Sequence, residues 1–243
     1  MSNVLKALAT ITAVAASAMG APAFAATQTV DSVGYTFSFD DELWGLGFGT
    51  AFSNAGNVFT FSGLDYSTTG NGIRGGTYGS FYNATLSDAV TITAKAGYQL
   101  TGVVTSATGS LQVGSDKQAG SKASAYAYGA SSWVTNTGNF GATSAGAVQI
   151  SVNAASSFDS LSYVTSDAGM VSFAPGTTSA KSSYELSGIT SATGSTSYGF
   201  ASQDTVSYAV AVSAVPEPET YALLLAGLGL MGAVVRRRNK HPA

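Results

Sequence analysis

The sequence predicts an all-β protein whose body, residues 26–213, folds as a jelly-roll-like β-sandwich. Short segments of the body alternate apolar with polar residues, which is the period of a half-buried strand. Clusters rich in glycine separate these segments, and no amphipathic helical stretch of ten residues interrupts them. The 243 residues suit one such domain with a targeting segment at each end.

The composition is that of a folded chain with few charges. Charged residues make up 9% of it, against about 25% in a typical soluble domain, whereas 45% is hydrophobic. The body holds five basic and eleven acidic residues, so it lacks the basic stripe that nucleic-acid binding needs. Cysteine is absent, so disulfides do not hold the domain together.

Residues 1–25 have the layout of a secretory signal peptide. Lys6 precedes an apolar stretch at residues 7–18, and Ala23-Phe24-Ala25 forms a small-x-small end. We expect cleavage before Ala26, which makes the body an exported domain.

The expected strands follow in order along the body. They are the alternating segment VGYTFSFD at residues 33–40, then residues 57–61, 89–94, 147–152, 170–173 and 204–214. Turns are expected at residues 68–76 and 172–178. Residues 98–110 resemble residues 184–195 after a one-residue gap, which predicts two similar strand–turn units in equivalent places of the two halves. Chance similarity within a Ser/Thr/Gly-rich chain is the alternative.

An uncharged run of 15 residues, 221–235, lies near the end of the chain, and Arg236, Arg237 and Arg238 follow it. As a helix the run spans about 22 Å, short of the ~30 Å hydrocarbon core of a bilayer. Its leucines cover all faces, and an arginine cluster beside an apolar helix is retained on the cytoplasmic side. These features predict a short C-terminal transmembrane helix. The alternative is a buried helix whose arginines lie at its negative end.

The segment ahead of this helix, Val215-Pro216-Glu217-Pro218, is expected to be extended, because each proline restricts the residue before it. An extended, accessible segment can enter the cleft of a processing enzyme. Together, this segment, the Leu/Gly/Ala-rich helix and the arginine cluster resemble the PEP-CTERM sorting signal of Gram-negative bacteria, here at residues 214–240. The same signal is also described as an ice-binding-protein C-terminal domain.

The resemblance implies that an exosortase, a membrane processing enzyme, recognises Pro216, Glu217 and Pro218 and cuts near them. It implies an inner-membrane intermediate, followed by release or transfer to the cell surface or extracellular matrix. It also implies a link to exopolysaccharide and biofilms. The three motif residues are then substrate residues, and Arg236–Arg238 form a cytoplasmic retention cluster.

Little in the body points to catalysis. A Ser-His-Asp triad or an ordinary zinc site needs imidazole or thiolate, but the single histidine, His241, lies beyond the sorting signal. We therefore expect no catalytic residue of these types and no cofactor. The densest acidic group is Asp40-Asp41-Glu42. If that segment is extended, Asp40 and Glu42 share a face, which leaves open a carboxylate pair for glycoside hydrolysis or a Ca²⁺ site. The alternative is a solvated turn that ends the strand at 33–40.

Four aromatic residues are candidates for stacking on sugar rings: Trp44, Trp133, Tyr126 and Tyr128. Tyr126 and Tyr128 lie two residues apart and should share one face of a strand. Packing in the core is the alternative for all four. Threonine shows no regular T-x-T spacing, which argues against a repeated ice-binding face.

Three functions remain. The leading hypothesis is a non-enzymatic, exported surface or extracellular-matrix protein. The second is a lectin-like carbohydrate-binding module, which needs an exposed aromatic platform or an acidic Ca²⁺ pocket. The third is a carboxylate-dependent glycan-active enzyme, which needs two acids facing each other across a groove.

Overall fold

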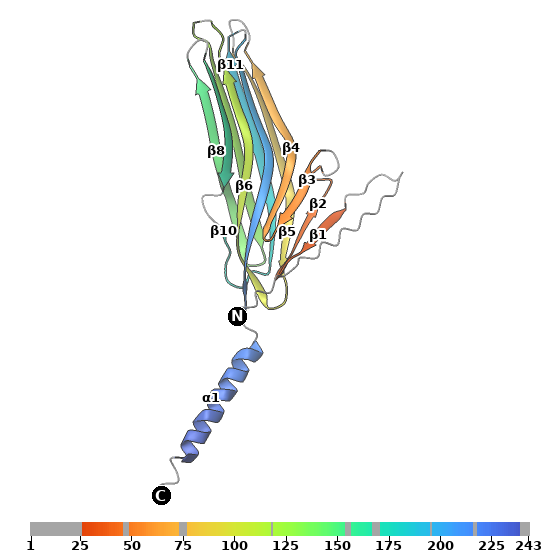
Figure 1. Ribbon diagram of the computed structural model, residues 1–243, viewed down its shortest axis with the longest axis vertical. Helices are drawn as coiled ribbons and strands as arrows, with labels where there is room; N and C mark the ends of the chain where they lie inside the picture. Colours follow the sequence, from red (N-terminus) through yellow and green to blue (C-terminus); the bar gives the residue numbers. More distant parts are fainter. Residues whose placement is uncertain are drawn as a thin grey trace, which may run out of the picture.

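The protein is a sandwich of two antiparallel sheets followed by one C-terminal helix (Figure 1). The computed structural model describes residues 26–45, 49–72, 77–117, 119–153, 157–166, 171–194, 196–215 and 218–238. In chain order the elements are β1 (Thr27–Asp31), β2 (Tyr35–Asp40), β3 (Ala51–Ala55), β4 (Val58–Asn71), β5 (Thr77–Ala94), β6 (Tyr98–Gly114), β7 (Lys122–Thr135), β8 (Gly138–Val152), β9 (Phe158–Ser166), β10 (Val171–Ser172), β11 (Ser179–Thr193), β12 (Tyr198–Ala214) and α1 (Pro218–Arg238).

The strand order is that of a jelly roll. The first sheet runs β1-β2-β5-β11-β7-β8, and the second runs β10-β6-β12-β4-β3, with β9 also paired to β6. Four antiparallel pairs set the winding: β4 with β12, β5 with β11, β6 with β9, and β7 with β8. They form one long double-stranded ribbon that passes back and forth between the sheets, which confirms the predicted fold class.

The two segments that resemble each other lie on β6 and β11, in opposite sheets. Apart from the two-residue β10, the jelly roll divides into β4–β7 and β8–β12, and each segment is the third strand of its half. Corresponding side chains point inward in both: Leu100 and Leu186 are buried, and so are Ala107 and Ala192. The two segments therefore occupy equivalent places in the two halves.

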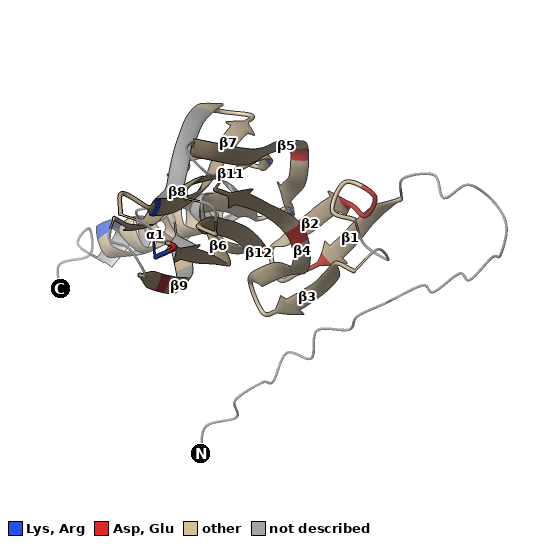
Figure 2. Cartoon of the chain, turned by 90° about the horizontal axis from the view of Figure 1, so that it is seen from above, with Lys and Arg blue, Asp and Glu red and all other residues tan. Residues whose placement is uncertain are grey.

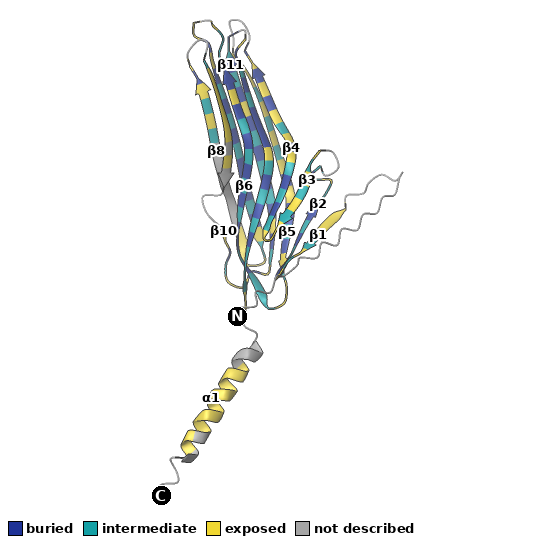
Figure 3. Ribbon diagram, in the orientation of Figure 1, coloured by how far each residue is buried: buried dark blue, intermediate teal, exposed yellow. Residues whose placement is uncertain are grey.

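The core changes character along the strands. One part is aromatic: Phe37 stacks on Phe59 with ring centroids 3.9 Å apart, and Tyr35 meets the edge of Phe59. A separate cluster has smaller side chains, namely Leu111, Val113, Ala123, Ala125, Ala127, Val152, Ala192 and Ala201. There the sheets lie so close that a Cβ on Gly199 would be 2.7 Å from the carbonyl oxygen of Ser124. Figure 3 shows buried and less buried residues alternating along the long strands.

The strands are longer than the sequence predicted. Residues 57–61 and 89–94 belong to β4 and β5, which are 14 and 18 residues long. The turn expected at 68–76 starts inside β4, where Thr68 and Gly70 continue the inward alternation, while residues 73–76 lie outside the described residues. Glycine and threonine at inward-facing positions give no apolar signal, so the strand predicted at residues 57–61 was too short. The turn at 172–178 is confirmed, since β10 ends at Ser172 and β11 starts at Ser179.

Candidate functional site

The C-terminal segment leaves the sandwich at the end of β12. Ala214 pairs with Tyr98 of β6, and the Val215 N–H donates a hydrogen bond of 2.8 Å to the Gly97 carbonyl oxygen. Pro216 and Glu217, two of the predicted sorting residues, lie outside the described residues. Pro218 is the first residue of α1 rather than part of an extended segment. Proline suits this position, since the first-turn N–H groups of a helix have no partner within the helix.

The predicted helix at 221–235 is confirmed and extends at both ends, to residues 218–238. Its described side chains between Ala222 and Arg236 are exposed (Figure 3), so the alternative of a buried helix is wrong. Arg236 lies exposed near the end of α1, and Arg237 and Arg238 form its last residues.

The sequence predicted that the helix at residues 221–235 is a short transmembrane helix. Within the part of the chain that the structure describes, no helix has the length and apolar character needed to cross a bilayer.

The predicted signal-cleavage residues are divided between described and undescribed parts of the chain. Ala23 and Ala25 lie outside the described residues, whereas Ala26 is described and immediately precedes β1. The Ala26 nitrogen lies 3.0 Å from Oδ1 of Asp41.

Both tryptophans belong to the core, so their assignment to sugar binding is wrong. Trp44 is 2% exposed, stacks on Phe61 at 3.9 Å, and donates its Nε1–H to the Ala89 carbonyl oxygen at 2.8 Å. Trp133 is fully buried and meets Tyr208 edge-on at 6.0 Å. Indoles fill a sandwich core well when their N–H finds an acceptor, which is the case for Trp44.

Tyr126 and Tyr128 do share one face of β7, as predicted. Both are partly exposed on the outer face of the first sheet. The strand register adds neighbours from three other strands: Phe81 of β5 pairs with Ile189 of β11, Ile189 pairs with Tyr126, and Tyr126 pairs with Gln149 of β8. Paired residues lie on the same face, so these four side chains form one row across the sheet. We call Phe81, Ile189, Tyr126 and Gln149 the outer row.

The outer row combines apolar and polar groups. Phe81 is 76% exposed and Ile189 is 50% exposed. Ile189 lies between two paired strands, whereas Phe81 lies on a part of β5 to which β2 does not pair. The next row adds Asn83, Ser187 and Tyr128. Across four strands at about 4.8 Å spacing, the row is roughly 14 Å long. Burial, followed by the charge of Glu185 and the neighbouring Tyr126, raises the pKa of Tyr128 above its ordinary value.

A small polar cavity lies beside the outer row. It has a volume of about 230 Å³ and is lined by Lys122, Ala123, Ser124, Asn153 and Ser191. Ser191 and Ser124 pair with each other two residues along from Ile189 and Tyr126, so the cavity continues the same face. An apolar row beside hydroxyl, amide and ammonium groups is able to bind a ligand that has both apolar and hydroxyl-bearing faces.

The acidic segment Asp40-Asp41-Glu42 turns the chain at the end of β2, as the alternative of a turn that ends the strand at 33–40 predicted. Oδ1 of Asp40 accepts hydrogen bonds from the N–H groups of Glu42 and Leu43, at 2.9 and 3.2 Å. The segment is therefore not extended, and Asp40 and Glu42 do not form a pair across a groove. No group of three or more His, Asp or Glu side chains able to hold a metal ion is found among the described residues. Figure 2 shows acidic residues distributed over several strands and turns.

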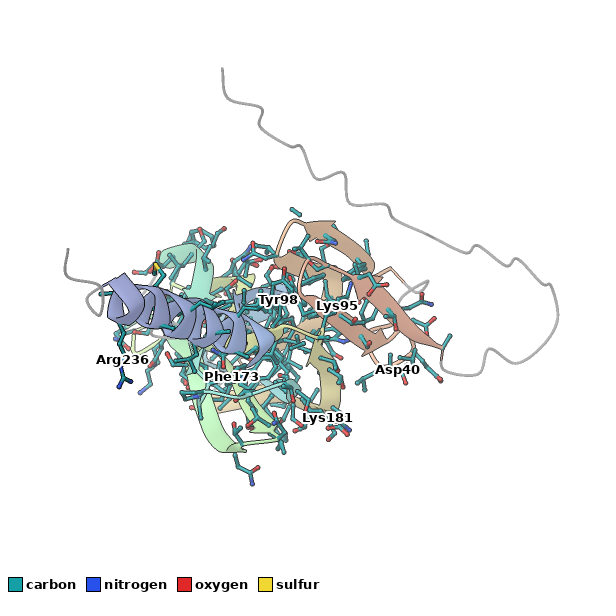
Figure 4. The ribbon with its side chains drawn as sticks, turned by 90° about the horizontal axis from the view of Figure 1, so that it is seen from below. Asp40, Lys95, Tyr98, Phe173, Lys181 and Arg236 are labelled. Carbon is teal, nitrogen blue, oxygen red and sulfur yellow. The ribbon has the colours of Figure 1, made fainter. Side chains whose placement is uncertain are left out.

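A larger cavity, about 780 Å³, lies between the β1–β2 turn, the β3–β4 turn and the end of β12. Asp31 and Lys95 (the latter labelled in Figure 4) form an ion pair of 3.1 Å in its lining. The hydrogen bond from Lys95, with a second one from Thr36, holds the pKa of Asp31 below its ordinary value. Gly97, which binds the start of the C-terminal segment, lies two residues beyond Lys95. This cavity therefore lies near the point where that segment leaves the sandwich.

The sequence did not identify Phe81 and Ile189 as candidate binding residues. Ile189 has small or polar neighbours and Phe81 is followed directly by Tyr82, so neither belonged to a clear alternating segment. The pairing of Tyr126 with Ile189, and of Ile189 with Phe81, joins strands that lie far apart along the chain. No local pattern reports such pairs.

Comparison with known proteins identifies the C-terminal segment. Residues 214–238 match the family described as the PEP-CTERM protein-sorting motif. This confirms the resemblance found in the sequence and is consistent with an exosortase substrate. The match does not extend into the body at residues 26–213. No curated protein matches the chain.

Solved structures similar to the chain include several carbohydrate-binding modules. One is TmCBM61 in complex with beta-1,4-galactotriose, with 7% identity, 75% of this chain and 86% of that chain covered, and a TM-score of 0.23. Another is the family 11 module from Clostridium thermocellum with a mixed-linked tetrasaccharide, with 11% identity, coverage of 79% and 90%, and a TM-score of 0.14. A structure of infectious bursal disease virus, Gx strain, has 11% identity, coverage of 75% and 48%, and a TM-score of 0.19. TM-scores this low do not establish a shared fold.

Proposed function

We propose that this chain is a non-enzymatic, exported protein of the cell surface or extracellular matrix, sorted by an exosortase and associated with exopolysaccharide. The observation that carries the proposal is the PEP-CTERM match at residues 214–238. Two features support it. The match begins where the sandwich ends, at Ala214, and the exposed helix α1 leaves the segment open to another protein.

The body then has the task of holding polysaccharide, and the outer row is the surface that suits this best. Sugar rings have apolar faces that stack on aromatic and aliphatic side chains, and rims of hydroxyl groups that pair with amides and hydroxyls. The apolar faces could stack on Phe81, Ile189 and Tyr126, and the hydroxyl groups could form hydrogen bonds with Gln149 and the polar cavity. The face has few charges, which suits a ligand bound through hydrogen bonds and stacking.

The sorting half of the proposal is tested by the intact mass and C-terminal sequence of the protein recovered from its producing cells and their medium. We expect a mature chain that ends near residues 216–219. Replacing Glu217 by Ala should preserve the full C-terminus, while Glu219→Ala, a matched change two residues later, should be processed. A wild-type chain that retains Arg236–Arg238 in every fraction would contradict exosortase sorting.

The polysaccharide half is tested by retention of the purified protein in gels that contain exopolysaccharide from the same cells. Phe81→Ala and Tyr126→Ala should each weaken binding about five- to tenfold, the loss expected for one aromatic contact. Phe158→Ala is the matched control, because Phe158 is 63% exposed on β9 of the second sheet. Equal losses in all three variants would indicate non-specific adhesion and contradict a site at the outer row.

A further inference from the structure

The carboxylate of Asp41 holds the start of the first strand. The Ala26 N–H donates to Oδ1 of Asp41 at 3.0 Å, and the Asp41 N–H donates to the Ala26 carbonyl oxygen at 3.3 Å. The second carboxylate oxygen, Oδ2, accepts a hydrogen bond of 3.3 Å from the side-chain amide of Gln28. Ala26 is thus bound through both its N–H and its carbonyl group, one residue outside the pairing of Thr27 with Asp40.

The three consecutive acids have separate roles. Asp40 (labelled in Figure 4) turns its carboxylate back onto the N–H groups of Glu42 and Leu43. The side chain of Glu42 is exposed and makes no hydrogen bond with a described residue. Of the three side chains, that of Asp41 bonds to Ala26. The ion pairs found among the described residues join Lys95 to Asp31 and Lys181 to Asp88, so Asp41 has no lysine or arginine partner there.

We propose that Asp41 is the binding site for the α-ammonium group that signal-peptide removal creates at Ala26. The proposal rests on cleavage before Ala26, which the Ala23-Phe24-Ala25 pattern predicts. Hydrolysis adds one water across the bond between Ala25 and Ala26. Ala25 becomes a carboxylate on the released peptide, and the Ala26 nitrogen becomes an amine that takes up a proton at neutral pH. The nitrogen already lies within hydrogen-bond distance of Oδ1.

Processing therefore changes the kind of contact, and the present distance of 3.0 Å already suits the new one. Before cleavage an amide donates to a carboxylate, and afterwards an ammonium group donates to it, which is the stronger, charge-assisted bond. The effect matters because β1 is the edge strand of the first sheet and most of its side chains are exposed. An edge strand with little burial depends on its backbone bonds and its ends to remain paired.

The test uses chains that run to Ala243 and start at a defined residue, released from a fusion partner by a protease that leaves no added residue. One chain starts at Ala26 and the other at Ala25, which moves the ammonium group by about 3.8 Å. The rate of acylation of the terminal amine near pH 7 is followed by mass spectrometry. An ammonium group bound to Asp41 keeps its proton and reacts slowly.

In the chain that starts at Ala26, Asp41→Asn should raise the acylation rate about three- to tenfold, a change of up to one pKa unit of the amine. Glu42→Gln removes the neighbouring charge and should leave the rate unchanged. In the chain that starts at Ala25, Asp41→Asn should have little effect. The melting temperature should fall by about 1–4 °C on Asp41→Asn in the first chain, and by less in the chain that starts at Ala25, where only an amide donates to Asp41.

Two results would overturn the proposal. One is an equal acylation rate for the Asp41→Asn and Glu42→Gln variants of the chain that starts at Ala26. The other is an exported protein whose first residue, read by N-terminal sequencing, is not Ala26. The first result rejects the site itself, and the second rejects the cleavage on which it rests.

Discussion

The side-chain amide of Gln203 donates a hydrogen bond of 2.7 Å to the hydroxyl of Tyr184, and this bond joins the two sheets through the core. Gln203 lies on β12 of the second sheet and is 1% exposed, while Tyr184 lies on β11 of the first sheet and is fully buried. Gly129 on the neighbouring β7 leaves room for the hydroxyl, because a Cβ there would collide with it. The polar pair fixes the position of one sheet against the other.

Replacing Tyr184 by Phe should lower the free energy of unfolding by about 1–3 kcal/mol, because the amide of Gln203 loses its partner while remaining buried. Urea denaturation measures the change. Tyr126→Phe removes a hydroxyl from the partly exposed outer row and should cost less than about 0.5 kcal/mol. Equal costs for the two variants would contradict a structural role for the buried bond.

Gly199→Ala should destabilise the sandwich by about 1–3 kcal/mol, the usual cost of overpacking. The added Cβ would lie 2.7 Å from the backbone oxygen of Ser124 in the opposite sheet, and a backbone atom moves less easily than a side-chain end. The same change at Gly227 of α1, where nothing lies within 4 Å, should leave the unfolding midpoint of the body unchanged. A neutral Gly199→Ala would mean that the sheets are further apart than described.

Trp44→Phe should lower the free energy of unfolding by about 1–3 kcal/mol, since the Ala89 carbonyl oxygen loses its donor and the core loses volume. Polysaccharide retention, measured well below the melting temperature, should be that of the wild type. Loss of retention with an unchanged melting temperature would restore Trp44 as a sugar-contacting residue.

Stability should decrease as the pH rises from about 10 towards 12. Burial, with a smaller contribution from the charge of Asp204, raises the pKa of Tyr82 to about 12. An unfolded tyrosine loses its proton near pH ~10, so above that pH the unfolded chain binds fewer protons than the folded one. The contribution of Tyr82 to stability is thus fully present below the pKa of tyrosine in the unfolded chain. It is lost as the pH rises towards the pKa of Tyr82 in the folded chain.

Melting temperatures at three pH values, about 9, 10 and 11, measure this decline, and Tyr82→Phe should make it shallower. Near neutral pH the same variant should be as stable as the wild type or more so, because the Tyr82 hydroxyl is buried without a hydrogen-bond partner among the described residues. A decline that is equally steep with Tyr82 replaced would show that other groups titrate there.

The sequence was most informative where side-chain chemistry is local. Alternating aromatics identified β2, whose Phe37 and Phe39 are buried as predicted, and the order of proline, apolar run and arginines identified the sorting motif. Strand lengths were underestimated because inward Gly70 and Thr68 have no apolar signature. Trp133 was misplaced because a strand exposes one face and buries the other, and the sequence does not say which. Trp44 lies in the turn after β2, and its packing on Phe61 of β4 is a contact that no local pattern predicts.

The candidate site was predicted in part. Tyr126 and Tyr128 could be placed on one face from their spacing, but Phe81 and Ile189 join them only through the register of β5 with β11 and of β11 with β7. Register between distant strands is set by the whole core and by turns, which a single sequence does not reveal. The contact of Asp41 with Ala26 was not predicted either, because no strand was expected at residues 27–31 to bring Ala26 beside it.

The central place of β12, between β6 and β4, has a consequence for the time at which the protein can fold. As the chain emerges from the ribosome, the β7–β8 hairpin is complete early, but β4 and β6 have no common partner until residue 214 has been made. The second sheet therefore closes last, around the strand that immediately precedes the sorting motif. Such long-range closure is slow, because the loop entropy is lost before the contacts are gained. For an exported chain this delay is useful, because a chain whose second sheet is still open is easier to thread across a membrane than a folded one.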